Sequence, residues 1–371
     1  MNALTRLHIQ LLRLQSRLQA PRRWNGARVR DGIRVDYGYD LVPGRDDILC
    51  GGLVKCQDLI PRFPSRRDAP NLLYLVSSAL PHDAAEQIRA CKRAGGVFVL
   101  NQNGVGYPAW HGPGWQTFNR PLSRAHEAAD HVIYQSAFCQ RAAEQWLTPR
   151  RGGHSILHNP VDCAVFTPAD EPPPAGPVLL TAGTHQFQYR VEIALRTLAE
   201  VKSTLPEARL LLAGRHTWAA NEEAARDELN RLAESLGVRE SVTHLPAYRQ
   251  EDAPDLMRGA HILLHTQVMD ACPRLVAEAL ACGLPVAYQA TGGTPELVPS
   301  GAGAGVTAQE DFETLTLPSP ESMADAVREI WSDYPARRQN AREHTLRHLD
   351  LPAWLDAHAD LFADLLGGPS Q

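Results

Sequence analysis

The sequence predicts an α/β protein with two successive domains, each a doubly wound parallel sheet. Strand-like apolar runs alternate with helix-like amphipathic runs through most of the chain, a rhythm typical of parallel sheets with crossover helices. A proline-dense stretch, TPADEPPPAGP, interrupts this rhythm once, after which it restarts. The length of 371 residues also exceeds one typical core. We therefore expect two domains facing a central cleft, with ligands bound beyond the carboxyl ends of the strands.

The first domain is expected over residues 31–167, where strand and helix patterns follow one another. A glycine pair ends the first of its helices, as glycine often does after the last helical turn. The strands are expected at NLLYLVSSAL (71–80), VFVLNQNG (97–104) and HVIYQS (131–136), and the helices at HDAAEQIRACKRAGG (82–96) and AFCQRAAEQWL (137–147).

A linker is expected at residues 168–177, and the second domain at residues 178–350. The same alternation there indicates another parallel sheet. Its strands are expected at VLLTAG (178–183), ARLLLAGR (208–215), VTHL (242–245), HILLHT (261–266) and LPVAYQA (284–290), and its helices at VEIALRTLAEVKSTL (191–205), NEEAARDELNRLAESLG (221–237), APDLMRGA (253–260) and PRLVAEALACG (273–283). Residues 351–371 close the chain with a further amphipathic helix.

The first 30 residues differ from the rest, because they carry seven arginines and no acidic residue. Leucines spaced three and four apart predict one apolar stripe on a helix. One interpretation is an amphipathic anchor, residues 1–24, on an anionic membrane face. The other is a helix packed on its own domain or on a partner subunit. A secretory signal fits poorly, since arginines interrupt the apolar stretch.

The composition argues against several classes of protein. The net charge of −5 argues against a bulk nucleic-acid binder. No run approaches 18 apolar residues, so we expect no membrane span. The seven cysteines are scattered and contain no Cys-x-x-Cys pair, which favours a reducing cytoplasm without disulfides or a zinc site.

The stretch DACPRLVAEALACGLPV, residues 270–286, predicts an anion site at a helix start. Pro273 suits the first helical position because it has no amide to leave unpaired. The amides of Arg274, Leu275 and Val276 would then lack intrahelical partners and face outward. The helix dipole also favours negative charge there, so a phosphate group would fit.

Two acidic residues flank this predicted anion site. Asp270 precedes the helix, and Glu278 lies about two turns in. A carboxylate beside a phosphate is unfavourable unless it accepts hydrogen bonds from hydroxyl groups. A nucleoside diphosphate sugar offers hydroxyls at both ends, ribose on one side and the sugar on the other. The alternative is a plain amphipathic helix with two solvated acids.

The segment DACPRLVAEALACGLPVAYQATGGTPELV resembles the acid-x7-acid region of the family 4 glycosyltransferases, which have the GT-B fold. The resemblance covers residues 270–298 and is highly specific. Three further blocks are similar to the same family: HNPVDCAVFTP (158–168), ADHVIYQSAFC (129–139) and DILCGGLVKCQDL (47–59). The resemblance implies two Rossmann-like domains and a final helix that crosses back to the first domain.

The resemblance also implies an activity, that of a retaining, hexosyltransferase-type enzyme. The sequence has no Asp-x-Asp motif and no histidines at ligand spacing, so we expect the transfer to need no metal and no other cofactor. The donor would be a UDP- or GDP-linked sugar, bound by the second domain. The acceptor would be a hydroxyl of a sugar, glycan or lipid-linked molecule on the first-domain side, as in polysaccharide or glycolipid assembly. Such an enzyme would be cytoplasmic or peripheral on the inner membrane, with no nucleic-acid partner.

Roles for second-domain residues follow from the same resemblance. Glu278 would accept from the ribose hydroxyls, and Asp270 would hold hydroxyls of the transferred sugar. Thr184 stands where the family has an arginine, so Arg190 becomes the expected clamp on the leaving diphosphate. Arg215 is expected to border the nucleotide.

First-domain residues are assigned less directly. Gly51 and Gly52 would let the backbone approach a phosphate or acceptor. Asn103 stands where the family commonly has a histidine, and it would hydrogen-bond a sugar hydroxyl. His111 would substitute for that histidine from a nearby loop, or else be a surface or packing residue.

Two other functions remain open. One is a non-catalytic GT-B protein that binds a nucleotide or partner, an alternative motivated by Thr184 and Asn103. The other is a different GT-B enzyme, such as a sugar epimerase or phosphorylase. A Rossmann dehydrogenase is disfavoured, since no Gly-x-Gly-x-x-Gly motif opens a helix.

Overall fold

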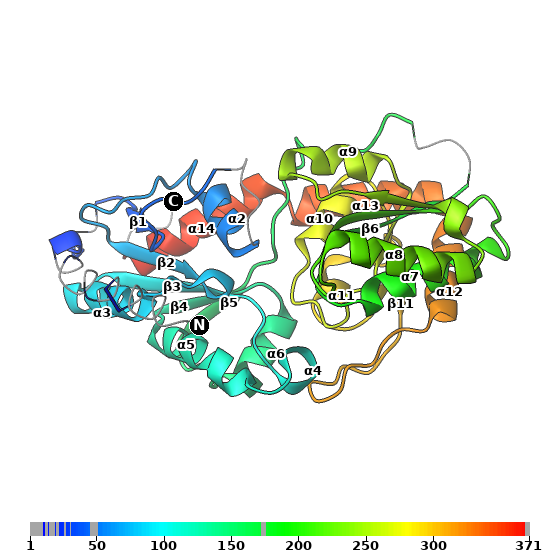
Figure 1. Cartoon of the computed structure of the whole chain (residues 1–371). Coiled ribbons are helices and arrows are strands. Elements are labelled where there is room, and N and C mark those ends of the chain that lie inside the picture. Colours follow the sequence, from blue (N-terminus) through cyan, green and yellow to red (C-terminus); the bar gives the residue numbers. More distant parts are fainter. Residues whose placement is uncertain are drawn as a thin grey trace. The chain divides into compact units, whose positions relative to one another are not determined.

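The chain folds into two compact units, Met1–His158 with Pro352–Gln371, and Asn159–Leu351 (Figure 1). The computed structural model describes residues 31–44, 51–171 and 176–367, together with positions 10, 11, 14, 19, 22–25 and 27–29. Each unit contains one parallel sheet with helices packed on it. None of the helices in this described part of the chain is long and apolar enough to cross a membrane.

The sheet of the second unit has the predicted doubly wound topology. Its six strands are β6 (Val178–His185), β7 (Arg209–His216), β8 (Val242–Leu245), β9 (Ile262–His265), β10 (Val286–Gln289) and β11 (Gly303–Val306). They are ordered β11-β10-β9-β6-β7-β8. The chain therefore starts in the middle, runs outward through β7 and β8, and returns to the other side of β6. The carboxyl ends of β6 and β9 meet at this reversal, where parallel sheets bind ligands.

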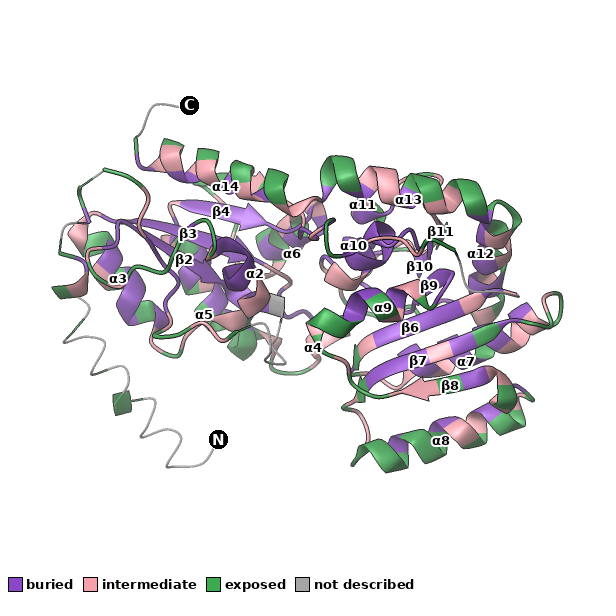
Figure 2. Ribbon diagram, turned by 90° about the horizontal axis from the view of Figure 1, so that it is seen from above, coloured by how far each residue is buried: buried purple, intermediate pink, exposed green. Residues whose placement is uncertain are grey.

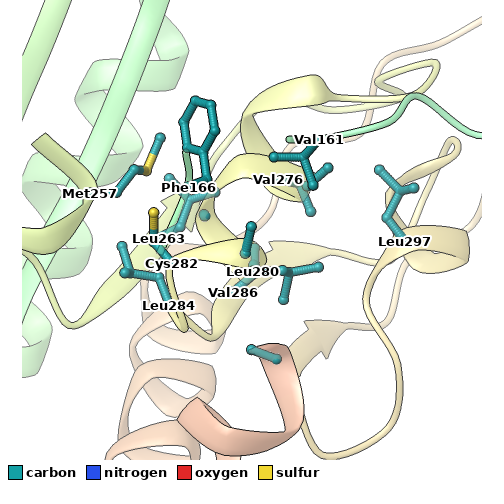
Figure 3. Packing of buried hydrophobic residues seen from close by; sticks show 14 of the residues in the cluster. Val161, Phe166, Met257, Leu263, Val276, Leu280, Cys282, Leu284, Val286 and Leu297 are labelled. Carbon is teal, nitrogen blue, oxygen red and sulfur yellow. The ribbon is translucent and has the colours of Figure 1, made fainter. Parts of the chain in front are cut away.

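Two apolar cores cover the two faces of this sheet. Successive strand residues point to opposite faces, so Leu263 enters one core while Ile262 and Leu264 enter the other. Figure 3 shows Leu263 and Val276 among the residues of the first of these cores. The helices of the unit are α7 (Tyr189–Lys202), α8 (Glu222–Ser235), α9 (Ala253–Arg258), α10 (Arg274–Ala281), α11 (Thr294–Leu297), α12 (Pro320–Ser332) and α13 (Tyr334–His348).

The sheet of the first unit has its five described strands in sequence order. These strands are β1 (Val35–Asp36), β2 (Leu72–Val76), β3 (Val97–Gln102), β4 (His131–Tyr134) and β5 (Gly153–Ile156). The unit also contains helices α2 (Gly51–Leu59), α3 (Ala84–Ala94), α4 (Pro108–His111), α5 (Trp115–Ala128), α6 (Ala137–Trp146) and α14 (Leu351–Leu365). Figure 2 shows β4 of this sheet and β6 of the other as largely buried.

The boundary between the units lies earlier than the linker predicted at residues 168–177. Residues after His158 already pack into the second unit. Val161 donates its amide to Leu349 O at 2.9 Å, and its carbonyl accepts from Leu351 N–H at 3.0 Å. The proline-dense composition therefore does not mark the division. Residues 172–175 of that stretch lie outside the described residues.

The end of the basic N-terminal segment packs on the first unit. Trp24 is buried, and Gly96 leaves room for it, because a Cβ at Gly96 would come within 2.9 Å of the indole. Arg23 donates to Gln87 Oε1 at 3.0 Å and forms an ion pair with buried Asp36. The predicted amphipathic helix over residues 1–24 otherwise falls almost wholly outside the described residues. Leu11 is described, and it is exposed.

The last helix, α14, packs on the sheet of the first unit. Phe362 contacts Phe63 and Tyr74, with ring centroids 5.3 and 5.9 Å apart. His358 Nδ1 lies 2.9 Å from Trp354 O and must donate, because a carbonyl only accepts. His358 Nε2 therefore accepts from Tyr74 O–H at 3.3 Å, which requires a neutral imidazole. Burial lowers the pKa of His358 to about 4.

Acid should weaken the docking of α14 through His358. The pKa of this group falls from 6.5 unfolded to about 4 folded, so its stabilisation is complete above pH 6.5 and is lost as the pH falls toward 4. The free energy of unfolding of His358→Gln is compared with that of the wild type at pH 7.5 and at pH 4.5. We expect the difference between the two proteins to change by about 2–3 kcal/mol between these pH values. Urea denaturation at both pH values measures this.

The exposed His348 provides the control, because His348→Gln removes a histidine from the adjacent helix without touching the buried pair. Its acid sensitivity should match that of the wild type. Equal acid sensitivity of all three proteins would show that His358 is not held neutral by burial.

Candidate functional site

The predicted anion site lies at the carboxyl edge of the second sheet. Helix α10 begins at Arg274, with Pro273 as its extended N-cap, so the helix starts one residue later than expected. No hydrogen-bond partner for the Leu275 amide is present among the described residues. The prediction that the Val276 amide lacks an intrahelical partner is wrong, because this amide donates to Pro273 O at 3.1 Å in the first turn of the helix. The amide of Val276 is therefore not available to an anion.

Asp270 lies on a loop that is fixed to its neighbours through the main chain. Its carbonyl accepts from Gly293 N–H at 2.7 Å, and Met269 N–H donates to Thr291 Oγ1 at 3.3 Å. Tyr189 Oη accepts from Val268 N–H at 3.4 Å, which ties the loop to α7. The Asp270 side chain is 28% exposed, so its carboxylate is held on a rigid support yet open to a ligand.

A glycine permits the close contact behind Asp270. Gly292 has φ +72°, a conformation that favours glycine, and a Cβ there would lie 2.5 Å from Asp270 O. Glycine at position 292 is thus required by close packing against the Asp270 loop.

Arg190 lies near the start of α7 and is 7% exposed. Its Nη1 donates to Thr184 O at 2.9 Å, and its Nε has no partner among the described residues. Burial lowers the pKa of the guanidinium, while Asp270, Tyr189 and Tyr248 act to raise it. The Arg190 guanidinium is therefore within electrostatic influence of Asp270, and also of Tyr248, which sequence reasoning missed.

Glu278 is less available than expected. Its side chain is 12% exposed, and Arg274 Nε donates to Glu278 Oε1 at 3.2 Å across one helical turn. This ion pair excludes the interpretation of two solvated acids for Glu278. Burial raises the pKa of Tyr248, and the Glu278 carboxylate raises it further. The Glu278 carboxylate and the Arg190 guanidinium therefore both act on the pKa of Tyr248, in opposite directions.

Arg215 occupies a different part of the same sheet edge. It is exposed at the end of β7 and lines a cavity of about 260 Å³ with His216, Arg226 and His244. Glu222, at the start of α8, accepts from the His216 amide at 2.8 Å and closes one wall of this cavity. No contact joins Arg215 to the Asp270 loop among the described residues.

The first-domain candidates lie in the other unit. Gly51 and Gly52 begin α2, and Gly52 is needed for packing, because a Cβ would lie 2.7 Å from Ser78 Oγ. Asn103 follows β3, and its Oδ1 accepts from Gly104 N–H at 2.8 Å, which closes a local turn. Packing thus gives a reason for glycine at position 52, and the approach of this backbone to a phosphate or acceptor stays a prediction.

His111 ends α4 in an aromatic cluster. Its ring lies 4.8 Å from that of Phe118 and 6.2 Å from that of Trp110. Its Nδ1 is buried with no partner among the described residues. Packing in the aromatic cluster therefore explains the position of the His111 ring, but it leaves the ring nitrogen Nδ1 without a hydrogen-bond partner among the described residues.

Comparisons with known proteins find relatives that match the second unit in sequence. Residues 168–346 match the family model described as glycosyl transferases group 1. The D-inositol 3-phosphate glycosyltransferase of Mycobacterium sp. (strain JLS) is 32% identical over 186 residues, which cover 47% of this chain and 40% of that protein. The gpi3 subunit of phosphatidylinositol N-acetylglucosaminyltransferase from Schizosaccharomyces pombe is 22% identical, covering 64% of this chain and 49% of that protein. The chain spans less than half the length of these curated relatives.

Solved structures share the architecture over most of the chain. Anabaena Alr3699/HepE in complex with UDP matches with a TM-score of 0.65 and 20% identity, covering 84% of this chain and 82% of that chain. The sucrose-phosphate synthase (tll1590) from Thermosynechococcus elongatus matches with a TM-score of 0.62 and 17% identity, covering 85% and 77%. At these identities the likeness shows the fold, and the chain has the GT-B fold.

Replacing Gly292 should disturb the Asp270 loop. We expect Gly292→Ala to lower the free energy of unfolding by about 1–3 kcal/mol, since alanine at positive φ is strained and its Cβ overlaps Asp270 O. Gly237→Ala is the matched control: its φ is +68°, and nothing lies within 4 Å of the added Cβ. Urea denaturation should show the larger loss for Gly292→Ala. Equal losses would mean that the Asp270 contact is not tight.

Proposed function

We propose that the chain is a glycosyltransferase that moves a sugar from a nucleotide diphosphate sugar to a hydroxyl acceptor, because residues 168–346 match the family model described as glycosyl transferases group 1. The observation that carries this proposal is the grouping of Arg190 and Asp270 at the switch point of the second sheet. A buried cation beside a partly exposed carboxylate, at the edge where parallel sheets bind ligands, suits a substrate with both anionic and hydroxyl groups.

The diphosphate would lie at the start of α10. The Leu275 amide and the positive end of the helix dipole favour an anion there. Arg190 would add a full charge through Nε, which has no partner among the described residues. Asp270 would accept from hydroxyls of the transferred sugar, and Glu278 from those of the ribose. The second of these roles requires Glu278 to share its carboxylate with Arg274.

The transfer would retain the configuration of the sugar. In this proposal the acceptor oxygen bonds to the anomeric carbon as the bond from that carbon to the diphosphate oxygen breaks. The acceptor proton passes to the departing oxygen, so no protein nucleophile is needed. Arg190 and the Leu275 amide stabilise the charge on the leaving diphosphate, and such stabilisation is usually the largest catalytic effect.

The names of similar proteins suggest which substrates to try first. One solved relative is a complex with UDP and another with UDP-glucose, so a UDP-linked donor is the first choice and a GDP-linked donor the second. Two curated relatives are named for inositol-containing acceptors, which makes inositol phosphates a sensible panel beside simple sugars.

A nucleotide-binding protein without catalysis is the second candidate. Thr184 favours it, because a threonine side chain carries no positive charge at the position where the resemblance expects an arginine. Its main-chain carbonyl also accepts from one N–H of Arg190. Nucleotide binding without turnover for any donor and acceptor in the panel would support this alternative.

Removing the charge of Arg190 should slow transfer far more than it weakens folding. We expect Arg190→Met to lower kcat by about 10²–10³-fold, the usual loss for one stabilising donor. Arg196→Met is the control, since Arg196 is exposed on the same helix and should keep full activity. Nucleotide release from UDP-glucose, UDP-N-acetylglucosamine and GDP-mannose measures this. An active Arg190→Met protein would exclude Arg190 as the clamp.

Metal removal should leave transfer unchanged. In the proposed site, Arg190 and the start of α10 supply the positive charge that a divalent cation supplies in metal-dependent enzymes. Activity after dialysis against EDTA should equal that before it, and added Mg²⁺ or Mn²⁺ should have no effect. A loss that Mn²⁺ restores would contradict a metal-independent mechanism.

A further inference from the structure

His265 is a buried histidine next to Asp270 for which the proposed function has no role. It is the last residue of β9 and 2% exposed. Neither ring nitrogen has a hydrogen-bond partner among the described residues. Its Nε2 lies 3.5 Å from Asp270 Oδ2. An unsatisfied buried polar group costs about 1–3 kcal/mol, so its retention needs a reason.

Each of the other buried histidines of the described residues makes at least one hydrogen bond, although Nδ1 of His185 has no partner among those residues. His261, at the opposite end of β9, accepts from Val178 N–H at 3.0 Å. The remaining four each have a hydrogen bond to a backbone carbonyl, a tyrosine or a serine: His126, His131, His185 and His358. Simple core packing therefore does not explain His265, whose nearest charged group is the Asp270 carboxylate.

Two further buried hydroxyls without a partner among the described residues lie next in the chain to His265 and to Gly293. Thr266 Oγ1 follows His265 in the chain and is buried without a partner. Thr294 Oγ1 is also buried without a partner among the described residues. Thr294 directly follows Gly293, whose amide donates to Asp270 O. Buried polar groups left open on two adjoining loops indicate a site that a polar ligand completes.

We propose that His265 is a positioning residue for Asp270 in the donor-bound enzyme, an inference that rests on the proposed function. His265 donates from Nε2 to Asp270 Oδ2, and this leaves Oδ1 to accept from a hydroxyl of the transferred sugar. The main chain of Asp270 is already fixed, so only the side chain must turn. Closing 3.5 Å to a normal bond takes a shift of about 0.5 Å, and such bonds often tighten only in the complex.

Replacing His265 by glutamine or by asparagine tests this geometry, because the two side-chain amides place an N–H donor at the positions of different ring nitrogens. Glutamine reaches the position of Nε2, and asparagine that of Nδ1. We expect His265→Gln to keep kcat within about five-fold, and His265→Asn and His265→Leu to lose about 10–100-fold, as removal of a supporting partner usually does. The affinity for UDP alone, measured by calorimetry, should not change in any of them. His261→Asn should retain activity.

A double-mutant cycle tests whether His265 acts through Asp270. If it does, His265→Leu in the Asp270→Asn background should cause no further loss. Multiplied losses, equal activity of the glutamine and asparagine variants, or a weaker affinity for UDP would each overturn the proposal.

A binding measurement makes the test independent of turnover. The extra affinity of UDP-glucose over UDP should fall alike in His265→Leu and Asp270→Asn. Unchanged extra affinity in His265→Leu would overturn the role of His265 alone. A wild-type protein that binds no nucleotide and turns over no donor would overturn the proposed function and this inference together.

Discussion

A buried positive charge at the switch point of the second unit is the constraint on which the rest of the site depends. Arg190 is almost wholly buried, and a charge in that position is costly unless an opposite charge is near. Asp270 provides the strongest such compensation, and Gly293 and Tyr189 hold its loop in place. Doubly wound topology brings these elements together, since Arg190 follows β6 and Asp270 follows β9.

Much of this arrangement could be predicted from sequence, because it depends on local patterns. The alternation of strands and helices predicted the two α/β domains, and the comparisons confirm the GT-B fold. Apolar periodicity and Pro273 predicted α10 to within one residue. Once that helix was recognised, its position after β9 predicted where Asp270 would lie relative to the sheet.

The remainder depends on tertiary contacts that no local pattern reveals. β5 was not predicted, because it is an exposed edge strand without an apolar run. The unit boundary was misplaced, since Val161 joins the second unit through hydrogen bonds to residues far along the chain. At Gly52 the sequence suggested only a ligand approach, and the close packing against Ser78 becomes visible only in the tertiary structure. His265 is the last residue of an ordinary apolar strand, and only its distance from Asp270 in the folded chain indicates a functional role.

A crystal structure of the chain with UDP tests the central claim most directly. The account predicts the diphosphate at the start of α10, with its oxygens within hydrogen-bonding distance of the Leu275 amide and the Arg190 guanidinium. Diphosphate bound elsewhere on the second unit, for example in the cavity beside Arg215, would contradict it. So would a complex in which Arg190 contacts only Thr184 and Asp270.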